Sequence, residues 1–430
     1  MNKLIIAFLF VALYQGAWAQ GTEGSPYSFY GIGDPNSSSF SNYKAMGEAQ
    51  TALSEPAYIN LKNSASFAGL RNPTFAIDFT MNWLNIESPS SSQNISSQYI
   101  NGVSFGFPIG KRFGAAFSVG PYTRIGYDIT SPQIDPILGN YNFTYAGEGG
   151  YNRATGGIGG MPIKNDENQL MLGVQANYYF GFSQTSRAVT DFVDDATVTS
   201  SKMINRTNIK DLAVDFGILY RRKLINKTWI SAGLNFKPTT NISATNQQLS
   251  YTYRPSGLND QIIDTVIEST EEGNVKLPNE LSAGLAIQFD ENWIISFDYT
   301  STDWSELQLI STPVSLSNSN QIAAGFQYIA NTDAVAKFLQ SIRYRGGFKY
   351  ENTRLNFGGT QLKSISGTAG LGIPIQKTKM LTTFNFGIEV GSRGQDGTTL
   401  VKENFTNLYI GLSMNPHKFD GWFIKTIKQT

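Results

Sequence analysis

The chain has 430 residues, of which 40% are hydrophobic, 13% aromatic and only 15% charged, and its formal net charge is +0. So few charges do not suit a surface in water, where about a quarter or more of the residues are charged, whereas they suit a β-barrel wall facing lipid. The neutral balance argues against a nucleic-acid partner.

The counts of Cys and His also limit the chemistry. The chain has no Cys and one His, His417, near its C-terminus. Disulfides, thiolate metal sites and thiol catalysis are therefore excluded, and a Ser–His–Asp hydrolase would depend on that one histidine. We expect no catalytic residues, no metal site and no cofactor.

The first 20 residues have the order of a secretory signal peptide. Lys3 gives the positive start, residues 4–14 an apolar core, and Ala17-Trp18-Ala19 a cleavage site. The core is too short to cross a bilayer, and no later stretch has about 18 consecutive apolar residues. We therefore predict that residues 1–20 are removed and that the protein is exported to a bacterial outer membrane without a helical anchor.

Residues 21–72 are rich in small residues and lack the alternation of a strand. Small residues allow a backbone to lie close against a surrounding wall, and the apolar side chains among them need burial. We predict an N-terminal hatch inside the lumen of a barrel; a loose periplasmic N-terminus is the alternative. The residues expected to form the hatch and meet a ligand are Phe29, Tyr30, Met46, Leu53, Asn63, Ala65 and Phe67.

From residue 73 onward the hydrophobic pattern has a period of two. Phe75, Ile77 and Phe79 alternate with smaller or polar residues, and later segments repeat this up to Met414. Fourteen such segments can be counted, which predicts an all-β fold: an antiparallel transmembrane β-barrel over residues 73–414. Short, charged connections alternate with longer polar ones such as 128–143, 183–202 and 247–277, as expected for periplasmic turns and external loops. Residues 415–430 are predicted to form a periplasmic tail.

The same alternation places a set of charged side chains in the lumen. They either fix the hatch and line a polar route, or form a satisfied network that merely fills the interior. The charged residues are Asp78, Asp215, Asp298, Arg343, Arg345 and Glu389, together with Lys349.

Three stretches carry a family resemblance: residues 25–34 (SPYSFYGIGD), Ala45-Met46-Gly47, and the ending Trp422-Phe423-Ile424-Lys425. With the hatch and the fourteen strands, they resemble the FadL/TodX family (OMPP1 type) of outer-membrane transporters for hydrophobic compounds, in its Bacteroidota branch. One motif departs from the family: its hatch often carries Asn-Pro-Ala, whereas this chain has Asn63-Ser64-Ala65. The resemblance implies ligand entry from outside, contact with the hatch, and sideways release where the third strand is kinked.

The third predicted strand, 112–127, contains Gly120-Pro121. Because proline cannot donate to a ladder, a mid-strand proline requires an edge or a bulge. The pair is either a lateral opening or a bulge sealed by a neighbouring side chain.

We therefore expect passive uptake of hydrophobic, fatty-acid-like small molecules through a hatch-gated barrel with lateral exit. The alternative is a non-transporting accessory barrel of an outer-membrane protein secretion or assembly complex, since the resemblance also covers FadL-like barrels with that role. The expected partners are outer-membrane lipid and hydrophobic small molecules, or other envelope proteins in the accessory role.

Overall fold

The structure is a computed structural model that describes residues 24–88, 92–135, 139–190, 199–224, 227–256, 259–310, 314–331, 337–377, 380–394 and 401–416. The predicted signal peptide and nearly all of the predicted tail lie outside these residues. Among the helices of the described part, none is long and apolar enough to cross a membrane.

One antiparallel sheet forms the wall of the molecule. It closes on itself because the last strand pairs with the first wall strand, with Met414 opposite Phe75 and Lys402 opposite Glu87. The wall strands are β2 (Thr74–Glu87), β3 (Ser92–Ile109), β4 (Phe113–Pro121), β5 (Thr123–Asp135), β6 (Gly139–Lys164), β7 (Asn168–Thr190), β8 (Ser200–Lys223), β9 (Trp229–Lys237), β10 (Thr240–Ser256), β11 (Asn259–Leu277), β12 (Glu280–Phe289), β13 (Trp293–Thr302), β14 (Ser319–Ile329), β15 (Arg343–Phe357), β16 (Thr360–Lys377), β17 (Met380–Arg393) and β18 (Lys402–Pro416).

Three of the wall strands are interrupted. β4 continues as β5, β9 as β10, and β11 as β12, so these seventeen segments make a barrel of fourteen strands, which confirms the predicted fold class. Each interruption lies at or next to a proline, namely Pro121, Pro238 or Pro278. Proline lacks the N–H that a ladder needs, which accounts for the breaks.

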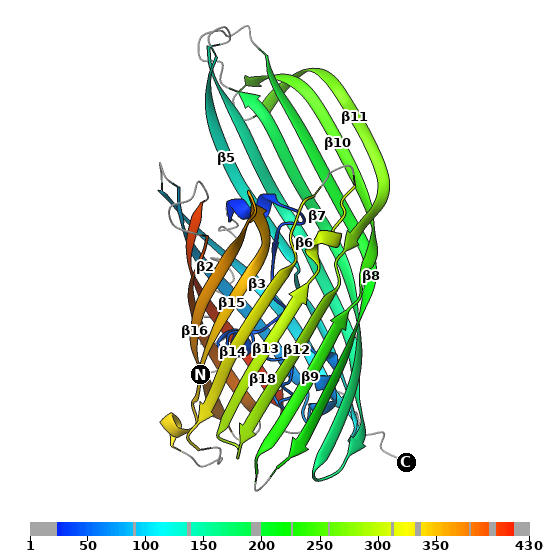
Figure 1. Ribbon diagram of the computed structural model, residues 1–430, viewed down its shortest axis with the longest axis vertical. Coiled ribbons are helices and arrows are strands. Elements are labelled where there is room, and N and C mark those ends of the chain that lie inside the picture. The colour runs from blue at the N-terminus through cyan, green and yellow to red at the C-terminus, as the bar shows by residue number, and fades with distance from the viewer. Residues whose placement is uncertain are drawn as a thin grey trace, which may run out of the picture.

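The wall is much taller on one side than on the other. β6, β7 and β8 have 26, 23 and 24 residues, whereas β13 and β14 have 10 and 11. Figure 1 shows β5 to β8, β10 and β11 rising above the rest of the barrel. The opposite end carries the short turns at 110–112, 165–167 and 290–292. By the rule for bacterial barrels that end is periplasmic, and the tall end is external.

The tall side corrects part of the sequence analysis. The expected loops 128–143 and 247–277 are mostly strand: β5 pairs with β6 as far as Asp135–Gly139, and β10 pairs with β11 as far as Ser256–Asn259. In the expected loop 183–202, the segments at both ends belong to β7 and β8. Much of this extension is polar in sequence, as in Thr245-Asn246-Gln247-Gln248, so the apolar alternation used to recognise strands is interrupted there.

Apolar side chains on the outer face of the lower wall are exposed, and those on the inner face are small, polar or covered. Phe117, Leu212, Phe216, Leu285 and Phe297 each expose more than half of their area. This is the arrangement of a wall that meets lipid outside.

The N-terminal residues 24–71, here called the lumenal segment, lie inside the barrel (Figure 1). Its helices and its one short strand are η1 (Pro26–Phe29), β1 (Asp34–Pro35), α2 (Ser41–Lys44) and η2 (Ser64–Gly69). Its apolar side chains pack against the wall in several clusters; one joins Phe67 and Leu70 to Ala116 of β4, and another joins Met46 and Leu53 to Ala286 of β12. η1 and Ile32 reach the external half and pack with the inward-folded segment after β13, which contains η3 (Trp304–Glu306). A last helix, η4 (Phe338–Gln340), precedes β15.

Candidate functional site

Buried wall carboxylates hold the lumenal segment by its backbone. Asp298 of β13 accepts hydrogen bonds from the backbone N–H groups of Gln50 and Thr51, both at 2.9 Å, and from the Thr51 hydroxyl at 2.6 Å. Its charge is paired with Lys62 at 3.1 Å. Asp78 of β2 accepts from the backbone N–H and the hydroxyl of Ser41. These groups satisfy donors that would otherwise be buried without a partner, which is costly.

Neutral and cationic wall side chains complete the attachment. Thr368 accepts from the Gly47 N–H and donates to the Ala45 carbonyl, both at 3.0 Å. Arg345 of β15 donates to the Tyr58 hydroxyl at 3.2 Å and also to Gln327 and Asn385. The segment is thus bound to strands on several sides of the wall.

The lower part of the segment lies against the wall without space for intervening side chains. A Cβ added to Gly173 of β7 would be 2.3 Å from the backbone of Ser64 and Ala65, and one added to Gly114 of β4 would be 1.9 Å from the Phe67 carbonyl oxygen. Glycine is the only residue that fits such an approach. In this half of the barrel η2 therefore packs directly on the backbone of the wall.

An ion-pair network holds the external end of the segment. Arg393 of β17 binds Asp34 at 3.0 Å and Glu403 of β18 at 2.6 Å, and it donates to the Ser25 hydroxyl at 2.8 Å. Glu403 is fully buried. Burial alone would raise the pKa of Asp34, but the charges of Arg393, Arg354 and Arg124 outweigh it and hold that pKa below its ordinary value.

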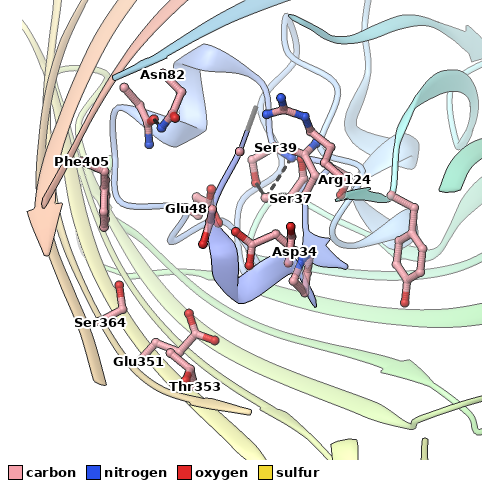
Figure 2. Close-up of a pocket in the computed structure, with 18 of the residues that line it drawn as sticks. Asp34, Ser37, Ser39, Glu48, Asn82, Arg124, Glu351, Thr353, Ser364 and Phe405 are labelled. Carbon is pink, nitrogen blue, oxygen red and sulfur yellow. Dashed lines mark hydrogen bonds between the residues drawn. The ribbon is translucent and has the colours of Figure 1, made fainter. Parts of the chain in front are cut away.

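A cavity of about 930 Å³ lies between the external half of the lumenal segment and the wall. Figure 2 shows Asp34 and Glu48 of the segment facing a space bounded on another side by Glu351, Thr353 and Ser364 of β15 and β16. Most of its charged side chains are paired; Glu389, for example, binds Lys349 at 3.0 Å and accepts from Ser366 and Asn407. Apolar side chains such as Phe79, Ile100 and Phe405 also line the cavity. Its lining is therefore mixed, whereas ligand pockets for apolar molecules are lined mainly by apolar side chains.

The ladder of the wall is broken beside Pro121. β3 pairs with β4 only over residues 103–109, and residues 92–102 of β3 pair on one side alone, with β2. β5 pairs with β6, but its other edge takes Asp34 and Pro35 of β1 opposite Arg124 and Thr123. β6 turns at the same level, where Gly149 and Gly150 have φ of 98° and 140°. The break between β3 and β5 is here called the wall gap.

Polar side chains cross the wall gap. The side-chain amide of Asn36 donates to the Pro121 carbonyl at 3.2 Å and to the Asn101 side chain at 3.1 Å, and it accepts from the Tyr99 hydroxyl at 3.1 Å. Arg124 of β5 stacks on the Tyr99 ring of β3 at 3.8 Å. The gap is therefore bridged by hydrogen bonds and by a cation–π contact.

The residues predicted from the sequence fall into two groups. Asp78, Asp215, Asp298, Arg345 and Glu389 are buried inside the barrel, and Arg343 lies 5.8 Å from the Tyr58 ring. Asp215 accepts from Gln175 and Asn177. The expected ligand-contacting residues of the hatch lie apart from the cavity: Met46, Leu53, Asn63, Ala65 and Phe67 are buried against the wall, while Phe29 and Tyr30 pack on Tyr127 and Phe357. Their contact with a ligand stays a prediction.

The sequence analysis missed most of the external network. Arg393 and Glu403 lie on inward positions that the alternation around Glu389 and Tyr409 would have indicated. Arg354 could not be found in this way, because the register of β15 shifts between Asn352 and Asn356 and residues 353–355 are all buried.

A closed antiparallel barrel with a lipid-facing outer surface and an N-terminal segment inside it defines an outer-membrane β-barrel protein. The BamG family model matches residues 1–427, so the chain belongs to the BamG family.

Solved structures with this fold are known. The chain is similar to the toluene transporter TbuX of Ralstonia pickettii, at TM-score 0.55 and 15% identity over 88% of this chain and 98% of that one. It is also similar to the toluene transporter TodX of Pseudomonas putida, at TM-score 0.55 and 14% identity over 87% and 98%, and to a FadL homologue of Pseudomonas aeruginosa, at 0.53 and 12% over 90% and 100%. At such identities the similarity establishes the fold, which is the one the sequence resemblance implied. No curated protein matches the chain.

Proposed function

We propose that this protein is an accessory barrel that docks other envelope proteins in an outer-membrane protein assembly or secretion complex. The observation that carries the proposal is the interior: buried carboxylates hold the lumenal segment, which packs closely on wall glycines, and the remaining cavity is lined by many paired charges beside apolar side chains. Such a lumen does not offer an apolar molecule the predominantly apolar site that its binding favours. Membership of the BamG family also favours the accessory role, which is one of the two roles that the resemblance implies.

The tall side of the barrel supports the docking role. A wall that only carries a molecule across the bilayer needs strands of about 9–11 residues, whereas β6, β7 and β8 are more than twice as long. The additional length provides protein surface outside the membrane, where a partner can bind.

Mild detergent extraction of membranes, followed by purification of the full chain and identification of bound proteins, tests the proposal. We expect a stoichiometric complex with envelope proteins that survives size-exclusion chromatography. In planar bilayers the purified barrel should conduct no more than the bilayer alone. A monomer without partners at every detergent strength, or steady conductance, would contradict the proposal.

The second candidate function is uptake of hydrophobic small molecules with sideways release. The wall gap favours it, because the ladder is broken next to Pro121 and β3 is joined there to Asn36, which follows β1, and to β5 by side-chain contacts. Movement of Asn36 and Arg124 would then open a route from the lumen to the membrane. Protein-dependent uptake of a labelled monoaromatic hydrocarbon into proteoliposomes would support this function, and uptake no faster than in protein-free liposomes would exclude it.

A further inference from the structure

The long strand β11 has an edge that pairs with no other strand in the described part of the chain. Along its length β11 pairs with β10, and on its other side a bridge joins Lys276 to Gln308 near the barrel. The next wall strand on that side, β13, ends at Thr302, after which the chain folds inward as η3. Residues 261–270 of β11 therefore present backbone donors and acceptors along an open edge.

This edge lies outside the lipid-facing band. On β8 the outward apolar series ends at Leu212, and the next residue on that face, Lys210, is exposed and charged. The neighbouring residue of β8, Ile209, lies opposite Ala244 of β10, which lies opposite Gly273 of β11, and residues 261–270 lie farther from the membrane than Gly273. At about 3.3 Å per residue, most of the edge stands well clear of the hydrocarbon.

The side chains of this edge combine apolar exposure with negative charge. Ile262, Ile263, Val266 and Ile267 expose between 39% and 62% of their area. Asp264 and Glu268 lie among them, and the sequence has no Lys or Arg from residue 261 to residue 275. Proteins usually protect an open edge with Lys, Pro or β-bulges. Residues 261–270 contain no Lys or Pro, and the register with β10 shifts at Ile263 and at Val266.

We propose that residues 261–270 of β11 bind an extended, basic segment of another envelope protein, which adds to the sheet as a further strand. Strand addition satisfies an open edge through main-chain hydrogen bonds, and pockets for alternate side chains then give specificity. The acidic side chains select a basic segment. A second copy of this chain is a poor occupant, because like charges would face each other across the new pair. This inference rests on the proposed docking function and names the surface and the chemistry of the partner.

A peptide that alternates lysine and valine over the length of the edge is the probe, with a glutamate–valine peptide as its counterpart. We expect the lysine peptide to bind the purified barrel, more weakly as salt is raised, and to slow hydrogen exchange at residues 261–270. The variant D264K/E268K should weaken binding by about tenfold or more. D166K/E167K, which makes the same charge change in the periplasmic turn between β6 and β7, should bind as the wild type does.

Absence of binding, protection at other residues, or equal binding by D264K/E268K would overturn the inference. The complex purified from membranes gives a second test, because β11 should exchange more slowly in the complex than in the isolated barrel. If β11 exchanges as fast in the complex as in the isolated barrel, no strand adds to residues 261–270 and the inference is refuted. The proposed docking function would still stand. If no complex exists, the proposed function fails, and the peptide experiment alone decides whether the edge binds basic strands.

Discussion

Asp298 binds Thr51 twice, accepting one hydrogen bond from its backbone N–H and a second from its hydroxyl. The two residues are 247 positions apart in the sequence, and the contact joins the barrel wall to the middle of the lumenal segment. Because the carboxylate is buried and charged, each of these bonds belongs to the stronger class of hydrogen bonds.

Replacing Asp298 with Ala should therefore loosen the lumenal segment. The backbone N–H groups of Gln50 and Thr51 and the ammonium of Lys62 lose their acceptor, so we expect a loss of about 1.5–3 kcal/mol in stability. Denaturant unfolding in detergent measures the loss, and limited proteolysis reports whether the segment becomes accessible. Asp166→Ala, at an exposed turn, is the matched control. Unchanged stability and protease resistance in the Asp298 variant would show that this contact does not hold the segment.

Gly173→Ala should disturb the packing of η2 against β7. The added Cβ would be 2.3 Å from the backbone of Ser64 and Ala65, so one of the two backbones must move, at about 1–3 kcal/mol. Gly367→Ala is the control, because a Cβ on Gly367 would meet no atom within 4 Å. The midpoint of thermal unfolding in detergent should fall for the first variant and stay within error for the second. Equal midpoints would mean that the close approach of η2 to β7 is not needed.

Removing the guanidinium of Arg393 should free the external end of the lumenal segment. Arg393→Ala leaves Glu403 buried and Asp34 without its closest cation, and breaking a buried ion pair costs about 3–5 kcal/mol. Hydrogen exchange of residues 24–36 should accelerate, while η2, held by separate contacts, should be unaffected. The double variant R393M/E403Q removes both charges and should recover part of the lost stability. Equal exchange in wild type and Arg393→Ala would argue against the network as the anchor.

The barrel could be predicted from the sequence because lipid on one side and the lumen on the other impose strict alternation, as in Phe75, Ile77 and Phe79. The same reasoning placed Asp78, Asp298 and Glu389 on inward positions. The external extension could not be predicted in this way. β10 above the barrel reads Thr245-Asn246-Gln247-Gln248, and without apolar alternation such a stretch cannot be distinguished from a polar loop.

The mixed polar and apolar lining of the cavity could not be predicted from the sequence either. Which inward side chains line empty space, and which pack against the lumenal segment, depends on the path of that segment. From the sequence alone, Met46 and Phe67 are suitable ligand contacts because they are apolar. In the structure both side chains pack against the wall. Asp34 binds Arg393, which is 359 positions away in the sequence, and no local sequence pattern predicts that pair.

Variants at the wall gap can distinguish the two candidate functions, docking and transport. Pro121→Val supplies an N–H with which the ladder between β4 and β3 can be extended, and Asn36→Ala removes the amide that bridges Pro121 and Asn101. For a docking barrel we expect neither variant to change the entry of a labelled monoaromatic hydrocarbon into proteoliposomes, which should match that of protein-free liposomes. Asn85→Ala, which removes an exposed Asn–Asn bond in the hairpin of β2 and β3, controls for the loss of an amide near the same rim. Uptake that depends on the protein, falls in Pro121→Val and rises in Asn36→Ala would establish the gap as an exit, and transport would then replace docking as the function of the lumen.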